Sequence, residues 1–378
     1  MADPPAVARR QVLAHRVVAH GLDRATTGAA DLAVADLGLQ DTPAGSAAMA
    51  LAARLPVATA ADRASAATVP EGWAIVWGVR GAPHVHRRRD LRTLARAVWP
   101  VDDGDAAARL GGAAPQLAAA GLGPIEALRA TAEALAAVVS APAVKGDAST
   151  ALTRTAPEAC TVYCRSCGVV HVQDQLMRLA ALPAGLDLER GTSPPVLRPI
   201  ARWPGVPDRH QGGGALVEAY LRVHGPATSG DVAAYLGTTR RAVVPDWPAG
   251  LAEVRVDGRR AWLPEDCLDD LLRAPEPDLV RLLPRSDPWL LARDRELVVP
   301  DPARRKALWP VLGAPGGLLV NGEVAGTWRT RATGRRLDVD VTPFGRLPAS
   351  ARAAVAGEAE LVAAARGAAE VRVRFVRR

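Results

Sequence analysis

Lysine is almost absent from this chain of 378 residues, and cysteine, phenylalanine and long apolar runs are scarce. Four cysteines are too few for a disulfide framework at this length, which favours a reducing compartment. No apolar run approaches the roughly 20 residues that a membrane-spanning helix needs, and the first residues, MADPPAVARRQVLAHR, lack the apolar core of a signal peptide. The sequence therefore predicts a cytoplasmic protein with no membrane partner.

Arginine carries the positive charge of the chain. Of 47 basic residues only Lys145 and Lys306 are lysines, which leaves 45 arginines (47 minus 2), and the formal net charge is +7. A GC-rich genome, whose codons favour arginine and alanine, is one explanation. The planar guanidinium group also suits phosphates and guanine edges, so a nucleic-acid surface is the other.

One stretch near the N-terminus places polar residues between two apolar helical patterns. In residues 31–54, DLAVADLGLQDTPAGSAAMALAAR, the triplet Gln40-Asp41-Thr42 separates the two patterns. A turn that leads into a second short helix is the skeleton of a helix-turn-helix, whose second helix presents its N-terminal residues to DNA base edges. We therefore expect Gln40 and its neighbours to occupy the presenting position.

The residues around this turn have the order of a winged helix. Residues 7–20 place valine and leucine on one helical stripe, and residues 72–79, GWAIVWGV, read as a buried strand. A basic loop with His84 and Arg87-Arg88-Arg89 follows, at the point where a winged helix contacts phosphates. These four residues are candidate DNA-binding residues, and an ordinary solvated loop is the alternative.

A clearer copy of the same order lies further along the chain. Residues 214–236 predict two helices, and Arg240 and Arg241 open a short third one. Asp257-Gly258 between two alternating runs is a strong hairpin signal, which supplies the wing. Because the start of the third helix is a common contact point for DNA, Arg240 and Arg241 are candidate DNA-binding residues, although winged helices also serve as packing modules.

The two copies share a sequence pattern. RVVAHG followed by DLAVADLGLQ corresponds to LRVHG followed by DVAAYLGTT, which sets Gln40 opposite Thr239. The C-terminal residues, from LLPRSDPWLL to GRRLDVDVTPF, alternate like strands with an Asn321-Gly322 turn. We therefore expect a mostly α protein with β (α+β). Its parts are tandem winged helices at 1–120, 121–210 and 211–280, then a small β-barrel-like module at 281–378 that ends in a helix at 349–367 and a strand at 370–377.

Cys160, Cys164, Cys167 and His171 lie within twelve residues of one another. The Cys-Arg-Ser-Cys-Gly turn among them is of the kind that zinc knuckles use. Because Cys160 has no matching second pair, we interpret the group as buried reduced thiols and a hairpin histidine, and we expect no metal and no cofactor. The zinc alternative is open to metal analysis.

Several segments resemble one actinobacterial family, the winged helix DNA-binding domain proteins that include the AlkZ and YcaQ DNA glycosylases. The similar segments are RGAPH at 80–84, HGPATSGDVAAYLG at 224–237, DGRRAWL at 257–263, and SDPWLL and VNGEVAGTWR nearer the C-terminus. The resemblance implies tandem winged helices with a β-barrel, and an enzyme that cuts the N-glycosidic bond of alkylated purines without a metal.

That family is recognised by Gln-x-Gln or Gln-x-Asp at the turn described above, and here the turn reads Gln40-Asp41-Thr42. The first glutamine matches, whereas threonine stands at the third position and the carboxylate at the middle one. The resemblance makes Gln40, Asp41 and Thr42 the candidate catalytic residues; the alternative is that Asp41 or Thr42 caps the following helix. A full Gln-x-Gln at Gln173-Asp174-Gln175 is interpreted as coincidence.

These features together predict a monomeric, monofunctional glycosylase that acts on double-stranded DNA. It would excise alkylated or bulky-adduct purines in base excision repair and associate with the nucleoid, with a role in genotoxin self-resistance left open. One alternative is a non-catalytic winged-helix DNA-binding protein or regulator, which the threonine at the third position favours. The other is a structural adaptor that uses its winged helices for protein contacts.

Overall fold

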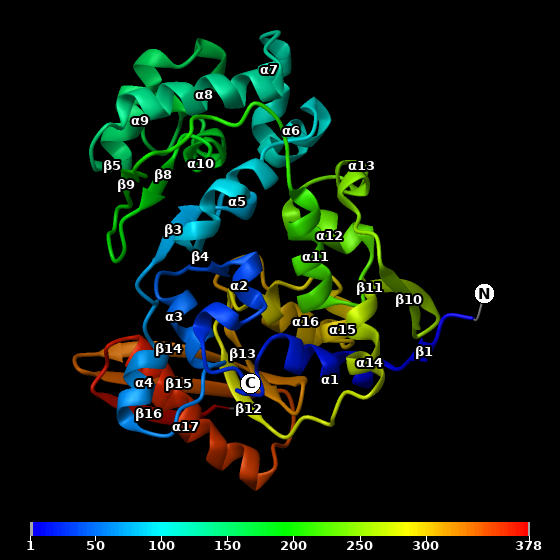
Figure 1. The fold of residues 1–378 in the computed structure, drawn as a ribbon. Coiled ribbons are helices and arrows are strands. Elements are labelled where there is room, and N and C mark those ends of the chain that lie inside the picture. The colour runs from blue at the N-terminus through cyan, green and yellow to red at the C-terminus, as the bar shows by residue number, and fades with distance from the viewer. Residues whose placement is uncertain (1–2, 377–378) are drawn as a thin grey trace. The chain divides into compact units, whose positions relative to one another are not determined.

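The computed structural model describes residues 3–376, which form two compact units (Figure 1). The first unit contains residues 3–71, 218–231 and 248–376, and the second contains residues 72–217 and 232–247. Each unit therefore combines segments that are far apart in the sequence. The four-domain division made from the sequence stays a prediction. Within the described residues, no helix is both long and apolar enough to cross a membrane.

A five-stranded sheet forms the C-terminal part of the first unit. Its strands lie in the order β12 (Val280–Leu283), β13 (Gly316–Val320), β14 (Glu323–Thr333), β15 (Arg336–Pro343) and β16 (Glu370–Phe375). Neighbours are antiparallel except for β15 and β16, which are parallel because α17 (Ala349–Ala365) carries the chain across between them. In the described residues β12 and β16 do not pair with each other, so the predicted barrel-like module is a half-barrel.

Most of the expected C-terminal elements are confirmed, although Arg377 lies outside the described residues. Asn321 and Gly322 form the expected turn with φ angles of 50° and 81°. The SDPWLL segment is not a strand, contrary to expectation, because Pro288–Leu291 is a 3-10 helix. Proline has no amide to donate to a sheet ladder, and the Asp287 carboxylate accepts a hydrogen bond from the Trp289 amide at 2.9 Å.

The core of the first unit lies between this sheet and α17. Val339, Val341 and Val355 are fully buried in one apolar cluster, and each such side chain contributes roughly 1.5–3 kcal/mol by leaving water. A neighbouring cluster joins the predicted first helix, α1 (Arg9–Ala19), to Trp289. Other helices of this unit are α2 (Val34–Leu37), α3 (Ser46–Ala52), α4 (Ala60–Ala66), α14 (Leu268–Leu272), α15 (Arg295–Val298) and α16 (Pro302–Leu308).

The second unit has its own antiparallel sheet. Its strands follow the order β4 (Pro83–Arg87), β3 (Trp73–Trp77), β8 (Leu186–Leu188), β9 (Val196–Pro199) and β5 (Ala143–Val144), and β3 is the predicted buried strand. Trp77, Leu135 and Met177 belong to the core that joins this sheet to the helices. These helices are α5 (Leu91–Ala97), α6 (Asp103–Leu110), α7 (Ala114–Ala119), α8 (Pro124–Val138), α9 (Lys145–Thr155) and α10 (Asp174–Ala181). A separate hairpin consists of β6 (Thr161–Cys164) and β7 (Val169–Val172).

The predicted helix, helix, helix, hairpin order of residues 214–264 is confirmed. The elements are α11 (Gly213–His224), α12 (Ser229–Leu236), α13 (Arg240–Val243), β10 (Leu251–Val256) and β11 (Arg259–Pro264). Asp257 and Gly258 make the expected hairpin turn, with φ angles of 46° and 82°. Near the N-terminus, β1 (Ala6–Val7) pairs parallel with β10, and β2 (Leu39–Gln40) leads into the turn before α3.

Candidate active site

The turn between β2 and α3 holds the predicted catalytic triplet in the first unit. Gln40 ends β2 and is half-buried, and the half-buried Asp41 follows it directly. One carboxylate oxygen of Asp41 accepts a hydrogen bond from the Ala47 amide at 3.0 Å, in the first turn of α3. Burial raises the pKa of Asp41 above its ordinary value, although hydrogen bonds from the Ala47, Gly45 and Ser46 amides oppose this. Asp41 therefore caps α3, and its raised pKa makes the carboxylate a stronger base than an ordinary aspartate.

Thr42 is held through its backbone. Its carbonyl oxygen accepts hydrogen bonds from the Ser286 hydroxyl and from Arg285 Nε, the latter at 3.2 Å. Its own hydroxyl is buried with no hydrogen-bond partner among the described residues. Thr42 thus fixes the turn against the loop that precedes the 3-10 helix at Pro288–Leu291, and its side chain makes no polar contact.

The expectation that α3 presents its N-terminal residues to DNA is wrong. All seven residues of α3 are buried. Its sequence, SAAMALA, is apolar on every face, so the helix is packed on all sides, with Met49 in the cluster under the sheet and Ala52 against Leu361 of α17. A helix without an exposed face cannot enter a DNA groove. The candidate catalytic residues therefore lie in the turn before α3 and not in the helix.

A hollow of about 240 Å³ opens beside this turn, within the first unit. Pro43 and Ser46 line it from the turn and the start of α3, and Trp328 lines it from the sheet. Three arginines also line the hollow: Arg285, Arg329 and Arg366. The guanidinium of Arg366 lowers the pKa of Asp41, although burial has the larger and opposite effect. The hollow therefore has three basic side chains in its wall, and one of them, Arg366, acts electrostatically on Asp41.

A buried ion pair stabilises the segments on either side of the turn. Arg54, two residues beyond α3, and Asp287 are both fully buried and form two hydrogen bonds of 2.7 and 2.8 Å. Arg54 also donates to the Ala50 carbonyl at 2.8 Å. Because Asp287 follows Ser286, one short loop holds both Thr42 and the end of α3. This gives SDPWLL a physical role in positioning the turn.

A second buried pair links another segment of the family resemblance to α1. The fully buried Arg16 binds Asp294 at 2.6 Å and donates to the carbonyls of Gly225 and Pro226 at 3.2 and 3.3 Å. His224, which precedes them, is fully buried, and burial holds its pKa well below the ordinary value. The HGP residues are therefore a neutral, structural part of the first unit.

The first group of predicted DNA-binding residues, His84 and Arg87 to Arg89, does not form one exposed loop. His84 lies in β4, is fully buried, and has its pKa lowered to about 3 by burial, so the loop expectation is wrong for this residue. Arg87 ends the same strand with its side chain 11% exposed. Arg88 binds Asp187 at 2.9 Å, and Arg89 is the most exposed of the three arginines. Only Arg88 and Arg89 can therefore reach a ligand from solvent.

Arg240 and Arg241 are exposed at the start of α13, as the sequence predicts. Thr239 caps this helix, its hydroxyl accepting from the Ala242 amide at 3.2 Å. The Arg241 side chain is 90% exposed and lies 3.8 Å from an Asp102 oxygen. Such an exposed pair contributes little to stability, which leaves the guanidinium available to an external anion.

The second Gln-x-Gln has structural contacts. Gln175 donates to the carbonyls of Arg109 and Arg80 at 3.1 and 3.4 Å, and Asp174 binds Arg178 at 2.6 Å. Gln173 donates to the side chain of Gln116 at 3.1 Å. These contacts agree with the interpretation of this motif as coincidence.

A family model described as DNA glycosylase AlkZ-like matches residues 34–365. This chain belongs to the AlkZ-like DNA glycosylase family. It is 30% identical over 187 residues to the interstrand DNA cross-link repair glycosylase of Streptomyces sahachiroi, and this match covers 47% of the chain and 48% of that relative. The match thus spans about half the length of the curated relative. The fold is similar to that of Streptomyces sahachiroi DNA glycosylase AlkZ, with a TM-score of 0.73 over 98% of this chain and 100% of that chain at 23% identity.

Membership of the AlkZ-like family confirms the resemblance stated from the sequence. Sequence reasoning named the turn but missed the residues that support it, Arg54, Arg285, Ser286 and Asp287. The available signal was SDPWLL, which carried the resemblance without an assigned role. Its partners lie more than 200 positions away, at Thr42 and Arg54, so no local pattern could connect them.

Proposed function

We propose that this protein is a monofunctional glycosylase that excises alkylated or bulky-adduct purines from double-stranded DNA. Its activity would serve base excision repair, including self-resistance to a genotoxin, and it would act as a monomer. The observation that carries the proposal is that the turn after Gln40 and Asp41 lines an arginine-bearing hollow through Pro43 and Ser46, in a chain of the AlkZ-like family. The cross-link repair named for the Streptomyces sahachiroi relative supports the same substrate class.

Hydrolysis of the N-glycosidic bond of an alkylated purine needs few catalytic groups. A purine alkylated at N7 is cationic, so it leaves without prior protonation. The bond from C1′ to N9 breaks, its electron pair goes to the purine and neutralises the charge, and the sugar develops oxocarbenium character. A water oxygen then bonds to C1′ and gives up a proton. Residues that orient this water and stabilise the positive sugar are sufficient for catalysis.

Asp41 and Gln40 have suitable groups for these tasks. The raised pKa of Asp41 makes its carboxylate a better proton acceptor than an ordinary aspartate, and its negative charge stabilises the sugar cation. The Gln40 side-chain carbonyl accepts a hydrogen bond from the water. Thr42 positions the turn through its backbone rather than reacting, since its carbonyl is bound to Arg285 and Ser286. Arg285, Arg329 and Arg366 would bind the phosphates that flank the lesion.

The test is a strand-cleavage assay without added metal. Purified protein should convert a duplex with one N7-alkylguanine into an abasic site, seen as a strand break after alkali. Gln40→Ala should lower the single-turnover rate roughly a hundredfold, because one positioned polar group contributes about 3 kcal/mol to such a transition state. A Gln40→Ala protein that binds the duplex normally and cleaves as fast as wild type would show that this site assignment is wrong.

A non-catalytic DNA-binding protein is the second candidate. It is favoured by the hydrogen bond from the Ala47 amide to Asp41, because capping α3 explains the presence of the carboxylate without a catalytic role. Wild-type protein that leaves a panel of alkylated purines intact while binding duplex tightly would select this candidate.

A further inference from the structure

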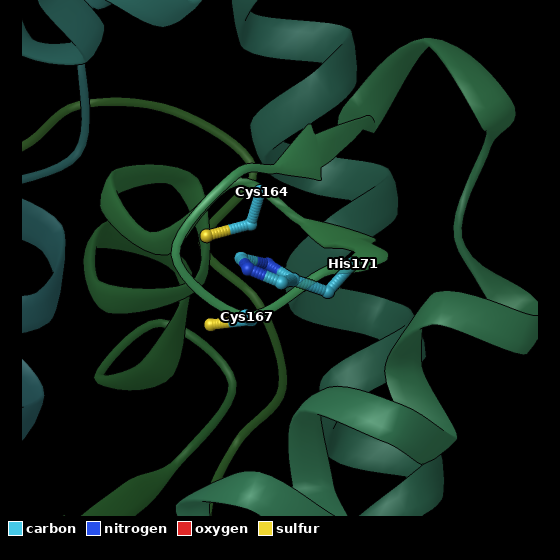
Figure 2. A group of neighbouring side chains, drawn as sticks. All are labelled: Cys164, Cys167 and His171. Atoms are coloured by element: carbon cyan, nitrogen blue, oxygen red, sulfur yellow. The ribbon is translucent and has the colours of Figure 1, made fainter.

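The β6–β7 hairpin brings two thiols and an imidazole together at one point. Figure 2 shows the His171 ring pointing between the side chains of Cys164 and Cys167. The two sulfurs and one ring nitrogen lie within 4.8 Å of one another. Cys160 is fully buried and is not part of this group, so the expectation of buried thiols is confirmed for Cys160 and wrong for Cys164 and Cys167.

The hairpin register builds the cluster. Cys164 pairs with Val169 and Val162 pairs with His171, so Cys164 and His171 lie on the same face of the two strands. Cys167 reaches the same face because the connecting turn folds back. Gly168 makes this possible with a φ of 71°, and its amide donates to the Cys164 carbonyl at 2.8 Å.

A backbone hydrogen bond fixes the orientation of the imidazole. His171 Nδ1 lies 2.7 Å from the Val172 carbonyl oxygen. A carbonyl only accepts hydrogen bonds, so Nδ1 donates to it, which leaves Nε2 as the ring nitrogen that coordinates a metal once it has lost any proton of its own. A histidine fixed in this way by a backbone carbonyl is the common second-shell arrangement of zinc sites.

The two thiols are free and accessible. Cys164 Sγ lies 3.0 Å from the Ser166 hydroxyl, which is 3.9 Å from Cys167 Sγ. Both cysteines are free thiols. Thiolate is the form that binds metal, so each sulfur can become a ligand by giving up its proton.

We propose that Cys164, Cys167 and His171 bind one zinc ion. Two sulfurs and one nitrogen are a soft donor set that selects zinc over magnesium or calcium, which require oxygen ligands. Three protein ligands leave the fourth tetrahedral position to a water molecule. Binding releases the thiol protons and forms two Zn–S bonds and one Zn–N bond, with no change of oxidation state.

The zinc would stabilise an otherwise weak element. Tyr163 is 61% exposed, and Val169 and Val170 are each 54% exposed, so the hairpin buries little apolar surface near its turn. A two-stranded hairpin of this kind is marginally stable by itself. A metal that links its turn to both strands would supply the stability that apolar packing does not provide there. This role is separate from the proposed glycosylase chemistry, which requires no metal.

The experiment measures metal content in tag-free, full-length protein expressed with added zinc sulfate. We expect about one zinc per chain by mass spectrometry, and at least a tenfold lower content in Cys164→Ser, Cys167→Ser and His171→Ala. Cys267→Ser is the matched control, because Cys267 is partly exposed but lies outside the cluster, and it should keep its zinc. Circular dichroism checks that each variant is folded.

A cobalt titration of the zinc-free protein provides the second measurement. Co²⁺ should give the visible bands of tetrahedral coordination with thiolate-to-metal charge transfer, weaker in each single cysteine variant than in wild type. Wild-type protein without zinc and without these cobalt bands would overturn the proposal. Zinc retained in Cys164→Ser at the wild-type level, or a Cys164–Cys167 disulfide in freshly prepared protein, would overturn it as well.

Discussion

The turns before α3 and α13 share one sequence pattern, but the first leads into a buried helix and the second into a helix that begins at the surface. Gln40 in the first copy corresponds to Thr239 in the second. Both turns cap the following helix, since Asp41 accepts from the Ala47 amide and Thr239 from the Ala242 amide. Every residue of α3 is buried, however, whereas α13 opens with two exposed arginines.

The composition of each helix explains the difference. A cap is a local interaction and fixes where a helix begins. Whether the helix then faces solvent depends on its side chains, and SAAMALA of α3 has no polar face while RRAV of α13 has one. The same turn can therefore place a polar triplet beside a packed core in one copy and present arginines to solvent in the other. Three predictions test this contrast.

The largest effect is expected from Arg54→Met, which removes the buried support of the first turn. Asp287 would be left fully buried without its partner, at a cost of about 3–5 kcal/mol in the free energy of unfolding. Urea denaturation measures this. The matched variant Arg241→Met, at a side chain that is 90% exposed, should change stability by less than about 0.5 kcal/mol. Equal effects at the two positions would contradict the contrast between a packed turn and an exposed one.

A smaller effect, on rate alone, is expected from Asp41→Asn. Asparagine still accepts the Ala47 hydrogen bond, so stability should change little, but the charge is lost and the rate should fall about a hundredfold. The wild-type rate should decrease as pH falls through the raised pKa of Asp41, because a base acts only when ionised. Single-turnover rates across pH should show this acid limb in wild type and not in the variant. An unchanged rate would assign Asp41 to capping only.

The smallest effect is expected from the double charge reversal Arg240→Glu with Arg241→Glu. If both arginines bind phosphates, the slope of log affinity against log salt should become shallower by about two units, because each lost contact removes roughly 0.9. Filter binding of duplex DNA over a range of salt concentrations measures the slope. Arg273→Glu is the control, at an exposed arginine of the first unit. The same change in the control would mean that net charge, not this helix start, governs binding.

The sequence by itself determined the local elements. The Asp257-Gly258 hairpin, the order of helices in residues 214–243 and the family resemblance were all predicted, because each depends on residues close together in the chain. Several strands of the C-terminal sheet were also predicted, from the alternation of their residues and from the turns between them. The candidate turn itself was also found in this way.

Tertiary structure decided which of these elements face solvent and what supports the candidate site. His84 proved to be buried, and α3 proved to have no exposed face. Arg54 and Asp287 are 233 positions apart, and their pairing depends on how the C-terminal half-barrel packs against α3. Such a contact has no local signature, because only the complete fold brings the two charges together, and their attraction and hydrogen bonds must offset the cost of taking both out of water.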